Sequence, residues 1–571
     1  MGCSSTKAVI SGIPPKHLSS KHEQSLAMTT TSLQKMRFLE SCFVIWFRDE
    51  ISNKFENEIK HLQKLVYGLK IFNNIDACVT FINNIQDEKV FLIISGTYRT
   101  LECFQNLSQL EKLFIFDPFQ QQNDVNYRTL KYDIIRNIDN LHKKLEEDVQ
   151  LCEVDLIPIS VVSPSSQDIL FSSVLTKQQA SFIFGQMINE IASRLKFESS
   201  SKDVLVDFCR LHYVNIDKQL RLIDEFSKDY RPNKILWWLV QPCFVSKILN
   251  RVQRTREIDI LYKFGFILKQ ANLQLNRLYK ENVSLIETIS IVYRGKTMTC
   301  VDFNTTIKNK CGSFLSFTNF LIATRNKKVA IDFVDRRLAI HPDMTGIVFE
   351  IHIDHTLLNE KNPFALLKDA DMNKDEICFY SSTVFRIESV EETMNGATIL
   401  WFVKLKQIDN NDQELLHILA PIRNPEVHNN QAYFLGKLLI DMEEYRRAEQ
   451  VLLALFQDPN FCSQPRRLVR LHNGLADIYT CKNEYTKALD HYHQALQMSL
   501  TYLPPDHPNL APIYKAIGNT HLNQNDCIHA LENYEKAMGL LEKDTLEFTV
   551  DLVTDLQTGI DKAKKLLESN Q

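Results

Sequence analysis

The sequence predicts a multidomain α+β protein in three folded parts: an N-terminal α/β layer, a central mixed sheet with a helical lead-in, and a C-terminal α-solenoid. Three observations support this class. The 571 residues exceed what one hydrophobic core holds. Apolar runs of strand length alternate with amphipathic stretches, and small residues recur at fixed spacing near the C-terminus. Only 15 glycines occur, so helix should predominate over a turn-rich all-β fold.

The charge balance and the cysteines exclude several classes of protein. Lys plus Arg (66) nearly balances Asp plus Glu (70), so the net charge of -4 offers no general attraction for nucleic acid. The 13 cysteines include no C-x-x-C pair, which fits neither a disulfide framework nor a zinc module. No apolar run approaches the ~20 residues that cross a bilayer. We expect a cytoplasmic protein that binds no nucleic acid and no metal.

Residues 1–38 are polar and predict a disordered tail that carries acyl chains. Gly2 and Thr6 meet the M-G-x-x-x-[ST] requirement for N-myristoylation, and Cys3 is placed for palmitoylation. Two chains give the stable anchoring that one myristoyl chain does not. The sequence therefore predicts a tether to the inner leaflet of a membrane, and the alternative is an unmodified polar leader.

Residues 39–165 predict a small α/β domain of unknown role. The segments 42–47, 90–95 and 112–116 are short, nearly continuous apolar runs, as expected for strands buried on both faces. A helical pattern over 57–70 lies between the first two. The alternation favours a parallel layer, and no G-x-G-x-x-G or Walker loop marks a nucleotide site in it.

The central part, residues 166–410, predicts helices followed by strands. Apolar residues at helical spacing fill 166–288, where Trp237 and Trp238 are interpreted as core anchors. Strand-like runs with polar turns between them fill 289–410 and predict a mixed or antiparallel sheet.

Residues 425–571 contain an internal repeat. The second and third units are offset by 42 residues, and small residues recur at matched positions in all three units: Gly436, Ala476 and Gly518, then Ala448, Ala488 and Ala530. Such residues let paired helices approach closely, and the pattern resembles tetratricopeptide repeats of the kinesin-light-chain type. That resemblance implies a groove that binds a protein or peptide partner. The alternative is a generic helical bundle.

The middle of the chain carries an arginine and a glutamate at strand ends. Arg294 and Gly295 end the apolar run "TISIVYRG", and Glu376 precedes the strand-like run "EICF". A guanidinium can bind a diphosphate through two parallel hydrogen bonds. This ordered set resembles the arginine-type mono-ADP-ribosyltransferases, the R-S-E class, over about residues 170–410. The alternative is that each residue is a solvated charge or half of a salt bridge.

The resemblance implies transfer of ADP-ribose from NAD or NADP to a protein side chain, with no metal. Glu376 should be the catalytic carboxylate that stabilises the oxocarbenium-like state. Arg294, with Gly295 beside it, should bind the dinucleotide. Phe320 begins the segment that carries Ser-Thr-Ser in the family, and Thr324 preserves its last hydroxyl.

The sequence departs from the family at two places. Ile322 and Ala323 replace the first two hydroxyl residues of the Ser-Thr-Ser segment. Lys374 stands where the family has an acidic residue or Gln, and its charge should repel an arginine acceptor. Three functions stay open: a transferase to which the repeats bring acceptor proteins, an inactive scaffold that acts through its repeats, and an enzyme that hydrolyses NAD without an acceptor.

Overall fold

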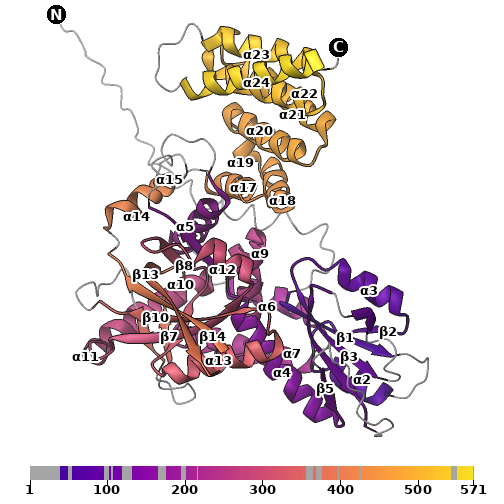
Figure 1. Ribbon diagram of the computed structural model, residues 1–571, viewed down its shortest axis with the longest axis vertical. Helices are drawn as coiled ribbons and strands as arrows, with labels where there is room; N and C mark the ends of the chain where they lie inside the picture. The colour runs from indigo at the N-terminus through magenta and orange to yellow at the C-terminus, as the bar shows by residue number, and fades with distance from the viewer. Residues whose placement is uncertain are drawn as a thin grey trace, which may run out of the picture. The chain divides into compact units, whose positions relative to one another are not determined.

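The computed structural model describes most of the chain (Figure 1). Contacts divide it into two compact units, Lys35–Val451 and a second unit that includes Leu452–Gln571. The predicted tail, 1–38, lies outside the described residues. Described are 39–48, 55–95, 102–104, 107–118, 132–164, 175–194, 201–214, 216–354, 364–367, 376–396, 398–409, 411–423, 427, 430–541 and 550–569.

The first sheet has five parallel strands in the order β2-β1-β3-β4-β5 (Figure 1). Its central strands coincide with the three predicted apolar runs and are buried on both faces, as a parallel sheet covered by helices requires. The strands are β1 (Cys42–Arg48), β2 (Lys70–Phe72), β3 (Lys89–Ser95), β4 (Leu110–Phe116) and β5 (Tyr132–Ile135).

Helices cover both faces of this sheet. One core cluster joins the sheet to α2 (Glu56–Gln63) and α4 (Ile138–Asp155), and the other joins it to α3 (Ile75–Asn83). Asn137 caps α4 by accepting hydrogen bonds from the backbone N–H groups of the first turn. The cap sets where α4 begins, and its far end reaches the candidate site.

The strand β6 (Ile159–Val162) belongs to the second sheet, although the predicted first domain runs to residue 165. It pairs antiparallel with β8 (Phe314–Phe317) at the edge of that sheet. The chain therefore leaves the first sheet at the end of α4, and residues 156–158 connect the two sheets.

A helical block follows, as predicted. Trp238 is 2% exposed, packs edge-on against Phe226 and lies tilted against Phe244, so it is a core anchor, whereas Trp237 is only partly buried. The helices are α5 (Lys177–Arg194), α6 (Ser201–His212), α7 (Asp217–Asp229), η4 (Pro232–Lys234), α8 (Ile235–Val240), α9 (Phe244–Thr255), α10 (Ile258–Glu281) and α11 (Val283–Ile286).

The second sheet has nine strands in the order β11-β12-β9-β7-β10-β14-β13-β8-β6. It is mixed, since β10 and β14 run parallel and the other pairs run antiparallel. The remaining strands are β7 (Ile291–Met298), β9 (Leu321–Thr324), β10 (Thr345–His352), β11 (Phe364–Leu366), β12 (Glu376–Phe379), β13 (Val384–Asn395) and β14 (Thr398–Gln407). Two helices lie within this part, α12 (Cys300–Thr306) and α13 (Lys327–Ile340).

The C-terminal part is helical. Among the described residues, four helices end the first unit or cross its boundary: α14 (Gln413–Ile418), α15 (Ala420–Arg423), α17 (Gln431–Asp441) and α18 (Tyr445–Phe456). The second unit contains α19 (Pro459–Cys462), α20 (Pro465–Cys481), α21 (Tyr485–Ser499), η6 (Pro508–Leu510), α22 (Ala511–Asn523), α23 (Cys527–Leu541) and α24 (Val550–Ser569).

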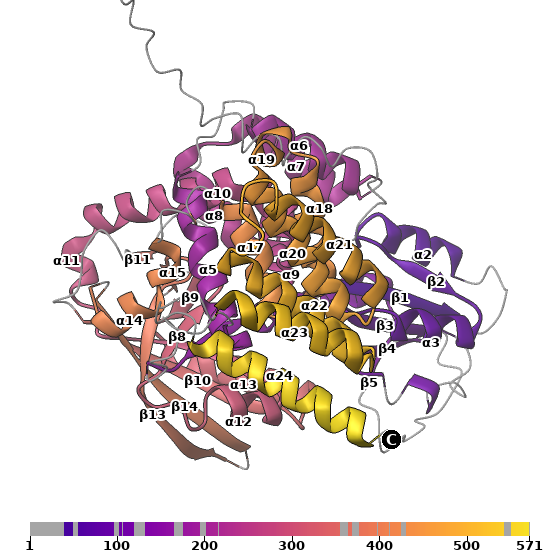
Figure 2. The ribbon, with the colours of Figure 1, turned by 90° about the horizontal axis from the view of Figure 1, so that it is seen from above.

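The repeat helices of the second unit lie side by side (Figure 2). Small residues permit this packing, since a Cβ added to Gly518 would lie 2.7 Å from the ring of Tyr534. Ala488 and Ala530 are fully buried, as the alignment of the repeats predicts. A mixed α/β protein with a C-terminal helical repeat region is therefore confirmed. None of the described helices combines the length and the apolar character that a membrane span needs.

Candidate functional site

The sheet brings the predicted arginine and glutamate into the same neighbourhood. Arg294 lies on β7 and Glu376 begins β12, with β9 between these strands. The register pairs Glu376 with Thr324 and pairs Thr324 with Tyr293. Two residues 82 positions apart are therefore separated by a single strand, close enough for their charges to interact.

The Arg294 guanidinium donates two hydrogen bonds, both to backbone carbonyl oxygens. Nη1 donates to the carbonyl oxygen of Ile322 on β9 at 3.1 Å. Nη2 donates to the carbonyl oxygen of Val154, at the end of α4, at 3.0 Å. Burial lowers the pKa of Arg294 to about 10, although the charges of Asp155 and Glu376 act in the opposite direction. This cation is thus held by neutral oxygens.

Lys296, two residues further along β7, is bound in the same way. Its Nζ donates to the carbonyl oxygen of Asp155 and to that of Ile157, the latter at 3.0 Å. Burial lowers the pKa of Lys296 too, against the raising effect of Asp155. Residues 154–157, which we call the closing segment, therefore accept hydrogen bonds from two neighbouring cations.

The Asp155 side chain anchors the closing segment. Its carboxylate accepts hydrogen bonds from the Thr297 backbone N–H at 2.7 Å, from the Thr297 hydroxyl, and from Arg337 Nε at 3.0 Å. Arg337, on α13, also pairs with Glu111 of β4. His341 Nε2 lies 3.1 Å from the Glu111 carboxylate. Burial would raise the pKa of Glu111, but the His341 and Arg337 partners outweigh it and lower that pKa to about 2.

The closing segment leaves little space beside the two cations. The cavity there has a volume of about 10 Å³, which is room for about one water molecule. Pockets for cofactors and drug-sized ligands have volumes of about 300–1,000 Å³. A cavity of this size does not hold a dinucleotide. The cavity is lined by Val154, Ile157, Arg294, Lys296, Phe317, Phe320 and Leu321.

Glu376 and Thr324 occupy the outer part of the site. Glu376 is partly buried, and burial raises the pKa of its carboxyl while the charge of Arg294 lowers it. The Thr324 hydroxyl accepts a hydrogen bond from the Asn326 backbone N–H at 3.1 Å, just before α13. A carboxylate with a raised pKa beside a cation is a common feature of catalytic sites, and it also occurs in structural ion-pair networks.

Gly295 has a packing role. A Cβ at this position would lie 2.4 Å from the carbonyl oxygen of Ala330 and 3.0 Å from two side chains of α13. The absence of a side chain lets α13 lie directly against β7. The structure thus gives Gly295 a reason other than the predicted binding of a cofactor. Phe320 lines the cavity beside Arg294.

Three predicted site residues lie outside the described part of the chain: Gly2, Cys3 and Lys374. Three others contribute to the site without having been predicted. Lys296 could have been predicted from the sequence, because side chains two residues apart on a strand, here Arg294 and Lys296, lie on the same face of the sheet. Asp155 and Arg337 come from other elements, and no local pattern marks them.

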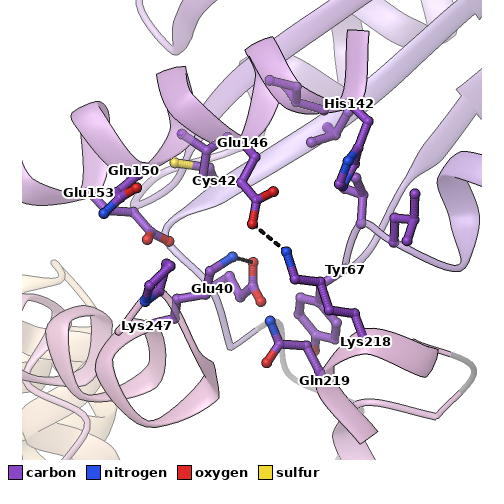
Figure 3. Close-up of a pocket in the computed structure, with 16 residues that line it drawn as sticks. Glu40, Cys42, Tyr67, His142, Glu146, Gln150, Glu153, Lys218, Gln219 and Lys247 are labelled. Carbon is purple, nitrogen blue, oxygen red and sulfur yellow. Dashed lines mark hydrogen bonds and ion pairs between the residues drawn. The ribbon is translucent and has the colours of Figure 1, made fainter. Parts of the chain in front are cut away.

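A second cavity, of about 50 Å³, lies against α4, β1, α7 and α9 (Figure 3). The Glu40 carboxylate accepts hydrogen bonds from Lys247 Nζ at 3.0 Å and from the Tyr213 hydroxyl at 3.1 Å. Glu146 forms an ion pair with Lys218. Glu153 is 6% exposed, and its Oε1 has no hydrogen-bond partner among the described residues. Burial and the charge of Glu40 raise the pKa of Glu153 to about 7, against the effect of Lys247 and Arg254.

Ion pairs hold the first sheet and its helices against the rest of their unit. Each of them joins a residue of 39–155 to one of 218–451. Such polar contacts are typical of domain interfaces that open and close, whereas large apolar interfaces stay shut. The pairs include Glu40 with Lys247, Glu88 with Arg251, Glu146 with Lys218, Glu111 with Arg337, and Asp87 with Arg447.

Comparison with known proteins assigns one part of the chain. Residues 467–543 match the tetratricopeptide repeat family model, and no curated protein matches the chain. BtubC (BKLC) from P. vanneervenii is similar at 20% identity over 27% of this chain and 65% of its own length, with a TM-score of 0.20.

Two further solved structures are similar at lower identity. The Vis toxin, an ADP-ribosyltransferase from Vibrio splendidus, is 14% identical over 39% of this chain and 92% of its own length, with a TM-score of 0.19. A STAND protein with a tetratricopeptide repeat sensor from Pyrococcus horikoshii is 10% identical over 93% of this chain and 80% of its own length, with a TM-score of 0.21. Likenesses this low do not indicate a function for this chain.

Proposed function

We propose that this protein is an NAD-dependent mono-ADP-ribosyltransferase whose dinucleotide cleft is held shut by the closing segment. The observation that carries the proposal is the Arg294 guanidinium, which is bound by two carbonyl oxygens and has no carboxylate within hydrogen-bond distance among the described residues. Lys296 beside it is in the same state.

A cation in this environment is costly for the fold. Desolvating a charge costs several kcal/mol unless an opposite charge and good hydrogen bonds offset it, and apolar residues of similar size often serve stability as well or better. Two such cations side by side are therefore poorly explained by stability alone. An anionic ligand that displaces the closing segment would give both of them a partner, and a diphosphate has the charge and oxygen geometry to do so.

The open site would perform the chemistry as follows. Arg294 and Lys296 bind the diphosphate, and Glu376 stabilises the positive charge that develops on the ribose as its bond to nicotinamide breaks. A nucleophilic side chain of the acceptor protein forms the new bond to the ribose carbon and loses its proton. Lys374, two residues before Glu376, disfavours arginine as that acceptor.

The repeats supply the second half of the function. The match over 467–543 indicates a protein-interaction role, because stacked helix pairs form extended binding surfaces. We propose that these repeats bring acceptor proteins to the transferase.

The second candidate function is a scaffold that acts through its repeats and has no catalytic activity. The closed cleft favours it, because no dinucleotide fits there in this conformation. The missing hydroxyls at Ile322 and Ala323 favour it too.

The experiment incubates the full-length protein with labelled NAD and a protein lysate, comparing wild type with Asp155→Asn and Glu376→Gln. Asp155→Asn removes the charge that anchors the closing segment, and Asp148→Asn on the same helix, which removes a buried carboxylate paired with Lys112, is the matched control. Weakening the closed state by about 1.4 kcal/mol raises the open fraction about tenfold. We expect labelling of acceptors to rise about tenfold with Asp155→Asn and to stay at the wild-type level with Asp148→Asn.

The double variant Asp155→Asn with Glu376→Gln decides between the candidates. Loss of the label in the double variant supports the transferase. Equal labelling with and without Glu376, or no label and no nicotinamide from any variant, overturns it and leaves the scaffold. Nicotinamide released without an acceptor protein, and lost with Glu376→Gln, identifies an NAD hydrolase.

We also propose that Gly2 and Cys3 are acylated and anchor the protein at the cytosolic face of a membrane. The sequence motif alone supports this. Feeding cells an alkyne myristate should label the protein, and Gly2→Ala should abolish the label. No label, or label that persists in Gly2→Ala, refutes the tether.

A further inference from the structure

The turn between α22 and α23 brings three metal-ligating side chains together. His521 lies in the last turn of α22, Asp526 precedes α23, and His529 lies in its first turn. One donor atom from each lies within 4.8 Å of the other two. Asp526 Oδ2 is 2.7 Å from His529 Nδ1 and 3.3 Å from His521 Nδ1, and the two imidazole rings are stacked 5.3 Å apart.

The preceding repeat provides an internal reference for this cluster. The offset of 42 residues aligns the three side chains with Tyr479, Glu484 and Lys487. There the same positions hold an ordinary ion pair, Lys487 to Glu484 at 2.5 Å, with the lysine over the Tyr479 ring at 5.4 Å. Repeat packing is therefore satisfied with one carboxylate and no histidine at these positions. The third unit keeps a carboxylate at the middle position, Asp526, and has histidines at the other two, so all three of its side chains can bind a transition metal.

One donor of the cluster lacks a satisfactory partner. His521 Nδ1 is buried and makes no hydrogen bond of good geometry among the described residues, although it faces the Asp526 carboxylate. A buried polar atom left without a hydrogen bond carries a desolvation cost. A metal ion between the three donors would remove that cost, because the lone pair would bind the ion.

We propose that His521, Asp526 and His529 bind a divalent transition-metal ion of the Zn²⁺ type. Two imidazoles and one carboxylate form a donor set that suits zinc, whereas magnesium and calcium prefer oxygen ligands alone. Three protein ligands leave one position of a tetrahedral ion open. His529 is exposed, so the open position faces solvent, where a side chain of a bound partner can complete the coordination.

This site was not predicted from the sequence. Zinc motifs are recognised by cysteine pairs or closely spaced histidines, and H-x4-D-x2-H resembles neither. The inference is independent of the proposed transferase, because it concerns the repeat unit alone.

The experiment measures metal binding by the full-length protein after removal of metals with EDTA and dialysis. Co²⁺ is the probe, because its visible absorption reports the geometry and the ligands, and Zn²⁺ is then added as a competitor. We expect one saturable Co²⁺ site with nitrogen and oxygen ligands, displaced by Zn²⁺. Absorption typical of thiolate ligation would instead assign the binding to exposed cysteines, namely Cys103, Cys300, Cys311 and Cys481, and would overturn the proposal.

The matched variant is His529→Lys, which restores the residue of the second repeat. Because Lys487 pairs with Glu484 there, the variant should fold and keep the thermal midpoint that the wild type shows in EDTA. Loss of a residue that only hydrogen-bonds to a metal ligand lowers metal affinity by about 10- to 100-fold. His529→Lys removes a ligand itself, so its Co²⁺ affinity should fall further than that.

His493→Ala is the control for a nearby histidine. The charge of His493 acts on the pKa of His521, but His493 is not one of the three clustered side chains. The variant should therefore keep the wild-type Co²⁺ affinity within about threefold. Unchanged affinity in His529→Lys, or no saturable binding in the wild type, overturns the assignment.

Discussion

Arg294 and Arg337 both contact the end of α4, and their environments differ. Arg337 is 4% exposed and lies between two carboxylates, those of Glu111 and Asp155. Burial lowers its pKa, but these charges outweigh the burial and raise it. Arg294 donates to two neutral carbonyl oxygens, and burial lowers its pKa to about 10.

The difference separates a structural cation from one that is available to a ligand. Arg337 is already paired within the fold. Removing it would leave the buried Asp155 carboxylate without its ion-pair partner and the Glu111 carboxylate with His341 alone. Arg294 adds little to the fold in the closed state, because carbonyl oxygens compensate a buried charge less well than a carboxylate does. On the proposed function, a site residue in the closed state is a charge whose present partners are replaceable.

The largest expected effect is that of Arg337→Gln. Breaking a buried pair by removing one partner typically costs about 3–5 kcal/mol. The thermal unfolding midpoint of the full-length protein should fall accordingly. Arg336→Gln is the control, since Arg336 is exposed and should change stability by no more than about 0.5 kcal/mol. Equal effects of the two variants would remove the distinction between structural and available cations.

Glu153→Gln should have an intermediate, pH-dependent effect. The pKa of Glu153 is raised to about 7 in the folded protein, so the native state binds this proton more tightly than the unfolded state. Its contribution to stability is present below pH ~4.5 and is lost as the pH rises through about 7. The variant should remove that loss and be about 1–3 kcal/mol more stable than wild type at pH 8.

Unfolding midpoints measured from pH 5 to pH 8 test this expectation. Glu147→Gln, an exposed neighbour on α4, should leave the pH dependence unchanged. A wild-type unfolding midpoint that does not change from pH 5 to pH 8 would show that Lys247 and Arg254 compensate the Glu153 charge. The same conclusion would follow if the midpoints of wild type and Glu153→Gln changed equally with pH.

The smallest expected effect on stability is that of Arg294→Gln. The amide can still donate to a carbonyl oxygen, and the buried charge disappears, so stability should change by less than about 1 kcal/mol or rise. Labelling from NAD, if present in Asp155→Asn, should vanish when Arg294→Gln is added. A cost comparable to that of Arg337→Gln would mean that Arg294 is a structural cation as well.

The sequence predicted secondary structure well where the apolar pattern was unambiguous. The runs at 42–47, 90–95 and 112–116 are strands, and the repeat helices pack through the predicted small residues. The strand at 159–162 shows the limit of such reasoning. A short apolar strand can complete either of two sheets, and its neighbours in space decide which one, so its own sequence is not sufficient.

The candidate site was partly predictable. Family resemblance placed Arg294 and Glu376 together, and the sheet order puts their strands, β7 and β12, on either side of β9. The closing segment was not predictable, because its contacts with Arg294 and Lys296 span about 140 positions of the chain. Backbone carbonyl oxygens are present at every residue, so no side-chain pattern reveals which of them will bind a cation.

By itself, the sequence determined the repeat array, the alternation of strands and helices, and the chemical types gathered near residues 294 and 376. These depend on local periodicity and on residue identity, which the linear order contains. Only the tertiary structure decided that the end of α4 lies against Arg294 and Lys296, that Asp155 anchors it, and that Arg294 has neutral partners. Burial and pairing depend on which distant segments meet, and that is a property of the whole packed unit.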